Sequence, residues 1–362
     1  MQNRIHKSRE VVINLSKILF SVIIPTTDPN RLPLLMRGID SLRNQDLAHS
    51  LFEIIVVSNY AFHLNRDIDI SIKIINTDQR ILGAKLVIGS VNANSDVLVF
   101  LEDDDTFAAN KLSTLNKVFS GDNKLGYFKN ALKLVSESGS EFHDPDFMDV
   151  RRNIYFNNGR ELMKSISLKN IGNFHSVVSS ITVRKRIIKK ISLCLMRINF
   201  NSDLALLLSA MDSDFSLSFS VDRLTNYTIH ESGTRFAPNI SKNEFISRMI
   251  NLLTDGITMS MELKSCVLSQ KPREFLDAIL IKQELERMRW QKVEFTVFLK
   301  KLLKYLSSLE SKNRDIKFLL INILFFIFPE QMKELFMTTF LKKIGQAKKI
   351  NIEPELPDSY HH

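Results

Sequence analysis

Cysteine, glycine and proline are all scarce in this chain of 362 residues. It has two cysteines, Cys194 and Cys266, with 11 glycines and 9 prolines. Two isolated cysteines cannot supply the clustered Cys and His ligands of a structural zinc site, nor the framework of a disulfide-rich domain. The low glycine and proline content excludes collagen-like and low-complexity chains. Two cysteines fit a reducing compartment, so we expect a cytoplasmic protein.

The chain also lacks an apolar stretch of the roughly 20 residues that a membrane-spanning helix needs. Its most apolar segment, residues 316–328, contains Lys317 and is followed by Pro329. A core helix with a solvated basic tail is the commoner arrangement. An oligomer contact stays open, as does an interfacial anchor on anionic lipid at the inner membrane surface, because Lys342 and Lys343 follow the segment.

The net charge is positive, at +9. A basic chain favours anionic partners such as nucleotide phosphates, nucleic acid or acidic lipid. No dense tract of lysine and arginine interleaved with aromatic residues occurs, so we expect no nucleic acid partner. With 44% hydrophobic residues, the chain is long enough for a large core and for two domains.

Short apolar runs alternate with helical patterns in the first part of the chain. The runs typical of buried strands are residues 20–24, 52–57, 71–75 and 96–101, and helix-period stretches occupy residues 34–42 and 84–91. This alternation predicts an α/β fold with an open, mostly parallel, Rossmann-like sheet and helices on both faces. Ligands bind beyond the carboxyl ends of the strands in such sheets. We therefore expect a ligand site at residues 25–28, 58–59 and 102–105.

Strand signals end near residue 240. Helix-period stretches follow at residues 245–253, 274–288 and 293–306. We predict one domain over residues 1–240 and an all-helical region over residues 241–362. The helical region would serve for packing, for an oligomer contact or for contact with a membrane surface.

The strongest chemical signal is a buried strand that runs into four acidic residues, Glu102, Asp103, Asp104 and Asp105. Adjacent carboxylates repel one another and need a counter-charge. Mg²⁺ and Mn²⁺ prefer carboxylate oxygens and bridge them to substrate phosphates. The alternative is a solvated acidic turn before a helix at residues 107–118, where carboxylates are favoured. Alone, the cluster leaves both readings open.

Several segments, in this order along the chain, resemble family 2 glycosyltransferases of the GT-A fold. They are the opening strand at residues 20–27, the second strand at 52–57, the glycine-containing segment at 81–85, the metal-binding DxD turn at 100–105, the acceptor-side strand at 173–184, the distal acidic helix at 202–204 and the closing Tyr-x-x-His segment at 227–234. The resemblance covers about residues 18–236. It implies a GT-A type sheet and a nucleotide-sugar-binding catalytic domain over residues 1–240.

The resemblance also implies roles for individual residues. Those that would bind the donor are Pro25, Thr26, Asp28, Asn59, Lys85, Glu102 and Asp103; those that would hold Mn²⁺ or Mg²⁺ are Asp104, Asp105 and His230; and the general base would be Asp203. The register of the acidic turn has two solutions, because Glu102 with Asp104, or Asp103 with Asp105, can form the DxD. We prefer Asp104 as the metal ligand, assisted by Asp105.

Two positions depart from the family pattern. Ser58 and Asn59 stand where the second strand commonly ends in paired aspartates, one of which contacts the nucleobase. An asparagine can still form hydrogen bonds with a base edge, but it brings no charge. The identity of the nucleobase in the donor therefore stays open, with UDP- and GDP-sugars expected. Ser202 and Asp203 replace the usual Glu-Asp pair and leave one carboxylate.

By resemblance, the chain is expected to be an inverting, metal-dependent, hexosyltransferase-like enzyme of polysaccharide or glycoconjugate biosynthesis. A sugar would pass from a nucleotide-diphosphate donor to a hydroxyl of a glycan or lipid-linked acceptor by direct displacement. Such chemistry needs a general base and a Lewis acid, and no covalent nucleophile. A homo-oligomer stays open.

Two other functions compete with this one. A nucleotidyltransferase also combines an α/β sheet with a metal turn, but residues 25–30 contain no glycine for a phosphate loop. A non-catalytic scaffold that keeps the fold, with its helices as an interaction module, would fit the missing carboxylates. The four acidic residues at the turn argue against it.

Overall fold

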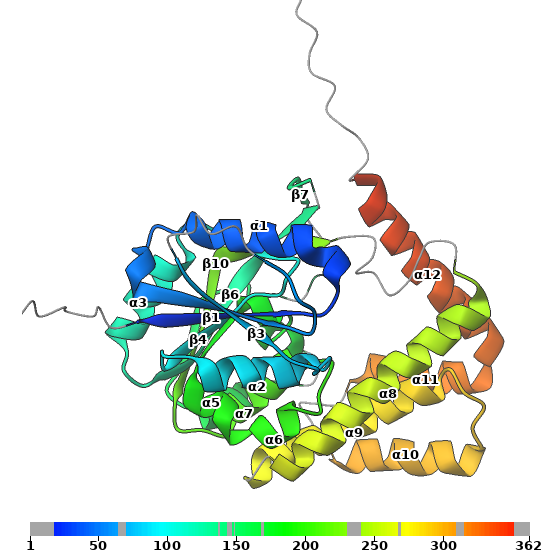
Figure 1. Cartoon of the computed structure of the whole chain (residues 1–362). Helices are drawn as coiled ribbons and strands as arrows, with labels where there is room; N and C mark the ends of the chain where they lie inside the picture. Colours follow the sequence, from blue (N-terminus) through cyan, green and yellow to red (C-terminus); the bar gives the residue numbers. More distant parts are fainter. Residues whose placement is uncertain are drawn as a thin grey trace, which may run out of the picture.

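The computed structural model describes residues 18–63, 70–136, 138–142, 147, 149–167, 170–229, 240–266, 269–308 and 315–350. Its centre is one sheet with the strand order β3-β2-β1-β4-β9-β6-β10-β5 (Figure 1). The strands are β1 (Phe20–Thr26), β2 (Phe52–Ser58), β3 (Ser71–Asn76), β4 (Val97–Phe100), β5 (Thr106–Phe107), β6 (Leu125–Ser136), β7 (Glu141–Phe142), β8 (Ile154–Phe156), β9 (Ile181–Arg184) and β10 (Ser216–Ile229).

The first four strands run parallel, as predicted. β1 pairs with β2 and β4, and β2 pairs with β3, all in parallel register. β1, β2 and β4 are buried along their whole length, which explains their nearly continuous apolar sequence. The other half of the sheet is mixed: β9 runs antiparallel to both β4 and β6, whereas β10 runs parallel to β6.

Helices cover both faces of the sheet (Figure 1). On one face, α1 (Leu32–Arg43) and α3 (Lys111–Gly121) pack against side chains such as Val22 and Ile24. On the other face, α2 (Leu82–Asn92), α5 (Lys185–Lys190) and α7 (Ser202–Met211) pack against Ile23 and its neighbours. The helix expected from residue 107 begins only at Lys111, because β5 pairs with β10 instead.

The predicted all-helical C-terminal region is confirmed for the residues that the structure describes. It consists of α8 (Lys242–Cys266), α9 (Gln270–Met288), α10 (Phe295–Ser308), α11 (Ile316–Ile327) and α12 (Pro329–Ile350). Met259, Leu263 and Leu276 from α8 and α9 belong to the same apolar cluster as Leu195 and the sheet. The helices therefore pack on the α/β part. The division at residue 240 stays a prediction. No helix in the described ranges is both long and apolar enough to cross a membrane.

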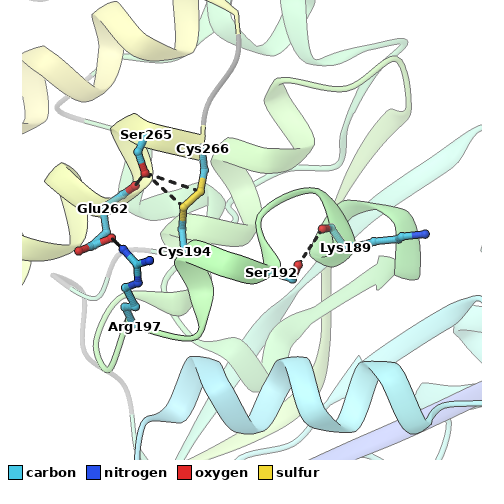
Figure 2. Close-up of a disulfide and its surroundings, with 7 residues drawn as sticks. All are labelled: Lys189, Ser192, Cys194, Arg197, Glu262, Ser265 and Cys266. Atoms are coloured by element: carbon cyan, nitrogen blue, oxygen red, sulfur yellow. Dashed lines mark hydrogen bonds and ion pairs between the residues drawn. A yellow bond between two sulfur atoms is a disulfide. The ribbon is translucent and has the colours of Figure 1, made fainter.

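The two cysteines form a disulfide, which the sequence analysis did not predict. Figure 2 shows the bond between Cys194, in α6 (Ser192–Leu195), and Cys266, the last residue of α8. An ion pair at 2.9 Å between Arg197 and Glu262 lies beside it. Sequence reasoning could not find this pair, because 72 residues separate the two cysteines. The bond fastens the helical region to α6.

Candidate active site

A cavity of about 810 Å³ opens at the carboxyl ends of β1, β2 and β4, where the sequence predicted a ligand site. Its lining consists of Pro25, Thr27, Asp28, Pro29, Arg31, Asn59, Tyr60, Arg80, Leu82, Lys85, Glu102, Asp103, Asp104, Asn199 and Phe200. Six of the seven expected donor-binding residues are among them, together with Asp104. The seventh, Thr26, is buried beneath the cavity, with its hydroxyl 3.0 Å from the hydroxyl of Tyr60.

A larger cavity, of about 1190 Å³, lies at the opposite edge of the sheet, beside the starts of β6 and β10. None of the predicted site residues lines it. Size alone would point there. The chemistry points to the smaller cavity, because its wall combines the acidic turn with cationic side chains at the strand ends.

Lys85 forms the base of the smaller cavity. Its ammonium donates hydrogen bonds to the carbonyl of Thr26 and, at 2.7 Å, to Oδ1 of Asn59. Burial lowers the pKa of Lys85 to about 8, while Asp103 opposes the shift and Arg80 adds to it. The contact gives Asn59 a role that the sequence did not predict: it holds the lysine at the end of β2.

Helix α1 holds the acidic turn in place. Arg37 donates hydrogen bonds of 3.0 Å to the carbonyl of Asp104 and to the hydroxyl of Thr228. Gly38 lets the helix approach, since a Cβ there would lie 3.3 Å from the carbonyl oxygen of Asp105. The turn is thus fixed between α1 and β10, so its carboxylates keep one orientation.

The carboxylates of the turn have different partners. Arg31 forms ion pairs with Asp104 and, at 3.1 Å, with Asp103. Asp105 is fully buried, and its Oδ1 accepts a hydrogen bond of 3.0 Å from the backbone N–H of Thr228. Burial raises the pKa of Asp103 to about 6, with Arg31 opposing, and burial together with Asp104 raises the pKa of Asp105 to about 8. Burial also raises the pKa of Glu102 well above its ordinary value.

The carboxylates of the turn are the candidate ligands of a divalent cation. Among the described residues no group of three or more His, Cys, Asp or Glu side chains could hold a metal ion. The expected ligand His230 lies outside those residues. Oδ2 of Asp103 and Oδ2 of Asp105 are, however, buried without a hydrogen-bond partner in the described part of the chain. Two spare carboxylate oxygens fit a cation that takes its other ligands from water and substrate phosphates.

Asp203, the expected general base, lies in the first turn of α7 and is 7% exposed. The helix has no side-chain cap, and Asn201 precedes it in the left-handed conformation. The side chain of Asp203 instead contacts His175, with Oδ2 2.7 Å from Nδ1. Its charge also contributes to the raised pKa of Glu102. Asp203 is therefore held by His175 and does not cap its own helix.

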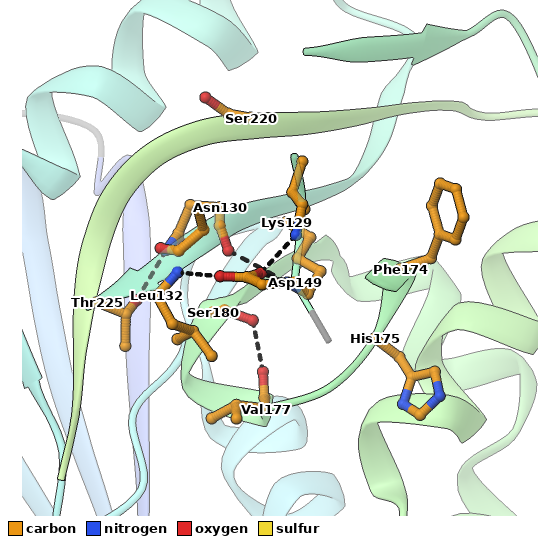
Figure 3. Close-up of polar contacts among 12 residues, drawn as sticks. Lys129, Asn130, Leu132, Asp149, Phe174, His175, Val177, Ser180, Ser220 and Thr225 are labelled. Carbon is orange, nitrogen blue, oxygen red and sulfur yellow. Dashed lines mark hydrogen bonds and ion pairs between the residues drawn. The ribbon is translucent and has the colours of Figure 1, made fainter. Parts of the chain in front are cut away.

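Buried lysines support the strands beside the turn. Nζ of Lys111 donates hydrogen bonds of 2.6 Å to the carbonyl of Ser179 and 2.8 Å to the hydroxyl of Thr225. Lys129 on β6 pairs with Asp149 at 2.6 Å (Figure 3). Burial lowers the pKa of both lysines. The contacts of Lys111 join α3 to β10 and to the segment before β9, and the contact of Lys129 joins β6 to Asp149.

Sequence reasoning missed several residues of the site. They are Arg31, Tyr60, Arg80, Asn199, Phe200 and His175. Arg31 follows Asp28 closely and could have been suspected as a counter-charge at the same strand end. Asn199 reaches the cavity, and His175 reaches Asp203, only through packing between distant segments. The sequence signal for Asn199 is Gly83. A Cβ at Gly83 would lie 2.0 Å from the carbonyl oxygen of Leu195, so only glycine lets α2 approach the segment that leads to Asn199.

Comparison with known proteins bears on this part of the chain. The model of the family described as Glycosyl transferase family 2 matches residues 21–133. This confirms the resemblance from β1 through the acidic turn and supports glycosyltransferase activity. Asp203 and His230 lie outside the match. No curated protein matches the sequence.

Solved structures confirm the GT-A type fold. The crystal structure of S. aureus TarS 1–349 has a TM-score of 0.53 and 13% identity. The same protein in complex with UDP scores 0.51 at 15% identity, and in complex with UDP-GlcNAc 0.52 at 14% identity. Each match covers 89% of this chain and 92% of the TarS chain. At such low identity the likeness concerns the fold alone.

Proposed function

We propose that this chain, whose residues 21–133 match the family 2 glycosyltransferases, is an inverting glycosyltransferase that uses a nucleotide-diphosphate sugar. The observation that carries the proposal is the cavity at the strand ends. Its wall brings the cations Arg31, Arg80 and Lys85 next to the acidic turn, with Asp203 close to Glu102. A donor diphosphate needs positive groups, and an acceptor hydroxyl needs a base.

In the proposed reaction the acceptor oxygen bonds to the anomeric carbon as the bond from that carbon to the diphosphate breaks. The electron pair leaves with the nucleoside diphosphate, and the acceptor proton goes to a base in the pair formed by Asp203 and His175. Arg31, Arg80 and Lys85 stabilise the charge that develops on the diphosphate. Asp104, Asp105 and His230 are the proposed ligands of Mn²⁺ or Mg²⁺, with Asp103 in place of Asp104 in the other register of the turn. The cation would neutralise the leaving group further.

The nucleoside would lie over the ends of β1 and β2, where Asn59 and Tyr60 line the cavity. A UDP-sugar is our first choice of donor, because structures of similar fold are in complex with UDP and with UDP-GlcNAc. A GDP-sugar is the second. The acceptor is proposed to be a glycan or a lipid-linked glycan.

Nucleoside diphosphate release from a panel of UDP- and GDP-sugars, with Mn²⁺ or Mg²⁺, tests the activity. We expect turnover with at least one donor and its loss, by about 10²-fold or more, in Asp104→Ala. Asp96→Ala is the matched control, because Asp96 is an exposed carboxylate at the opposite end of the same strand region, paired with Arg184. Asp103→Asn and Asp105→Asn then decide the register of the turn. Metal-dependent turnover that survives in Asp104→Ala would remove that residue from the metal site.

A second proposal concerns α10 and α11. Exposed apolar side chains gather on the two helices, including Phe295, Leu303, Ile316, Leu320 and Ile327. Neither helix carries an acidic residue. Their exposed lysines are Lys300, Lys304 and Lys317. We propose that this face contacts an anionic lipid surface, since apolar side chains flanked by lysines favour that boundary.

Sedimentation with vesicles tests the lipid proposal. The protein should bind vesicles that contain phosphatidylglycerol, should not bind those of phosphatidylcholine alone, and should lose binding in Leu320→Asp. Leu193→Asp is the control, because Leu193 is an exposed leucine on α6. A dimer that forms without lipid and that Leu320→Asp dissociates would contradict the proposal and assign the face to a second copy of the chain.

A further inference from the structure

His175 lies in the segment 173–184, which resembles an acceptor-side strand, but the sequence did not single out the residue itself. It follows Phe174 at the end of the 3₁₀ turn Ile171–Phe174 (Figure 3). The N–H of Val177 donates to the His175 carbonyl. Nδ1 of His175 is 2.7 Å from Oδ2 of Asp203, and the histidine side chain is 16% exposed against 9% for the aspartate. No other polar contact of the His175 ring occurs in the described part of the chain. The imidazole is thus the more accessible member of the pair.

The backbone on both sides of this contact is strained. Among the described residues only two other than glycine have a positive φ: Ser176 at 34° and Asn201 at 57°. One directly follows His175 and the other lies two residues before Asp203. Such conformations are disfavoured for residues other than glycine and gather where function fixes a geometry. The hydroxyls of Ser176 and Ser202 are also buried without a partner in the described ranges. Unfavourable backbone conformations and unpaired buried hydroxyls are therefore concentrated around the pair of His175 and Asp203.

The contact fixes which ring nitrogen carries the proton. An ionised carboxylate only accepts hydrogen bonds, so Nδ1 of His175 must donate to Asp203. In the neutral ring Nε2 then has a free lone pair and can accept a proton. The same arrangement also occupies one oxygen of Asp203, the group that would otherwise be the base.

Resting on the proposed glycosyl transfer, we infer that His175 is the catalytic base and that Asp203 is its positioning residue. Nε2 takes the proton of the acceptor hydroxyl as the new bond to the anomeric carbon forms and the diphosphate leaves with its electron pair. The carboxylate of Asp203 stabilises the imidazolium, and the proton then passes to water. Glu102 links the pair to the cavity: it lines the cavity, it senses the charge of Asp203, and its backbone N–H donates a hydrogen bond of 2.9 Å to the hydroxyl of Ser179, four residues after His175.

Turnover of UDP-GlcNAc, with water or an added glycan as acceptor, is the first test. His175→Ala should lower kcat by about 10²–10⁴-fold, leave the Kd for UDP unchanged and recover at least about tenfold on addition of imidazole. Asp203→Asn should lose as much, and the double variant should lose no more than either one. His49→Ala is the matched control, because His49 lies before β2, at the edge of the sheet away from the cavity. Near wild-type kcat in His175→Ala with a loss in Asp203→Asn would overturn the inference.

The pH profile gives a second readout. The titratable groups around the pair are Glu102 on the turn, Tyr127 and Lys129 on β6, and Tyr227 on β10, all of which sense the charge of Asp203. Because an imidazole is protonated at a higher pH than a carboxylate, an imidazole base places the acid limb of kcat/KM at the higher pH. A limb in the ordinary range of a carboxylate contradicts the inference.

A third readout does not need turnover. Nitrogen-detected NMR should show His175 in the Nδ1–H tautomer, and Asp203→Ala should remove that preference. An Nε2–H tautomer in the wild type overturns the inference even if no donor is found. Absence of turnover by the wild type with every nucleotide sugar would instead count against the proposed function, so the two failures are distinguishable.

Discussion

Gly83→Ala tests how the cavity wall is built. Gly83 lies in the first turn of α2, and its N–H donates a hydrogen bond of 3.0 Å to the carbonyl of Ile198. An added Cβ would lie 2.0 Å from the carbonyl oxygen of Leu195 and 2.7 Å from that of Ile198. Real Cβ atoms essentially never approach closer than 3.0 Å, so the helix and the segment must separate by about 1 Å.

The displaced segment carries Asn199 and Phe200, which line the cavity. Asn199 also accepts a hydrogen bond from the N–H of Leu82. Overpacking costs about 1–3 kcal/mol, and loss of the hydrogen bond from Gly83 adds about 0.5–1.5 kcal/mol. The better helix propensity of alanine returns at most about 1 kcal/mol. We therefore expect the free energy of unfolding to fall by about 1–3 kcal/mol and the affinity for UDP to weaken about tenfold.

Gly121→Ala is the control, because nothing lies within 4 Å of a Cβ built at the end of α3. Urea unfolding gives the stability of both variants, and isothermal titration calorimetry gives the Kd for UDP. If Gly83→Ala is as stable as Gly121→Ala and binds UDP like the wild type, the reasoning that segment 195–200 forms a rigid wall is refuted.

Three further predictions concern the charge, the disulfide and the helices. The affinity for UDP should fall as the pH rises through about 8, where Lys85 loses its charge, and calorimetry at pH 7 and pH 9 should show no such fall in Lys85→Met. Reduction of the bond between Cys194 and Cys266 should lower the free energy of unfolding, measured by urea titration, by about 4 kcal/mol, because the bond closes a loop with a sequence separation of 72. An unchanged unfolding midpoint would show that the bond does not constrain the unfolded chain. A chain that ends at residue 240 should aggregate in size-exclusion chromatography, because it exposes the apolar surface that Leu263 and Leu276 cover; a soluble monomer would contradict this packing.

The parallel half of the sheet could be predicted because its strands are buried on both faces. β1 and β2 carry apolar residues at nearly every position, so both read directly as strands. The position of the acidic turn followed, since strand ends meet at one edge of a parallel sheet. The mixed half of the sheet is harder to predict from the sequence. Its strand β10 has 14 residues and register shifts, and its exposed and buried positions do not alternate regularly.

Contacts between distant segments account for what the sequence could not give. The pairing of His175 with Asp203 joins residues 28 positions apart, and neither lies in a local pattern that requires the other. Arg31 as the counter-charge of the turn depends on how α1 packs across β1. The disulfide depends on the position of α8 against α6. Local periodicity predicts elements, but these pairs arise only when the elements pack.

The central claim is that the chain transfers a sugar from a nucleotide donor by inversion. Time-resolved proton NMR of donor turnover, recorded before mutarotation, measures the anomeric configuration of the first product from the α-linked donor that turns over best. We predict a β product, released together with nucleoside diphosphate. An α product would contradict direct displacement, and no release of nucleoside diphosphate from any donor would contradict the assignment as a glycosyltransferase.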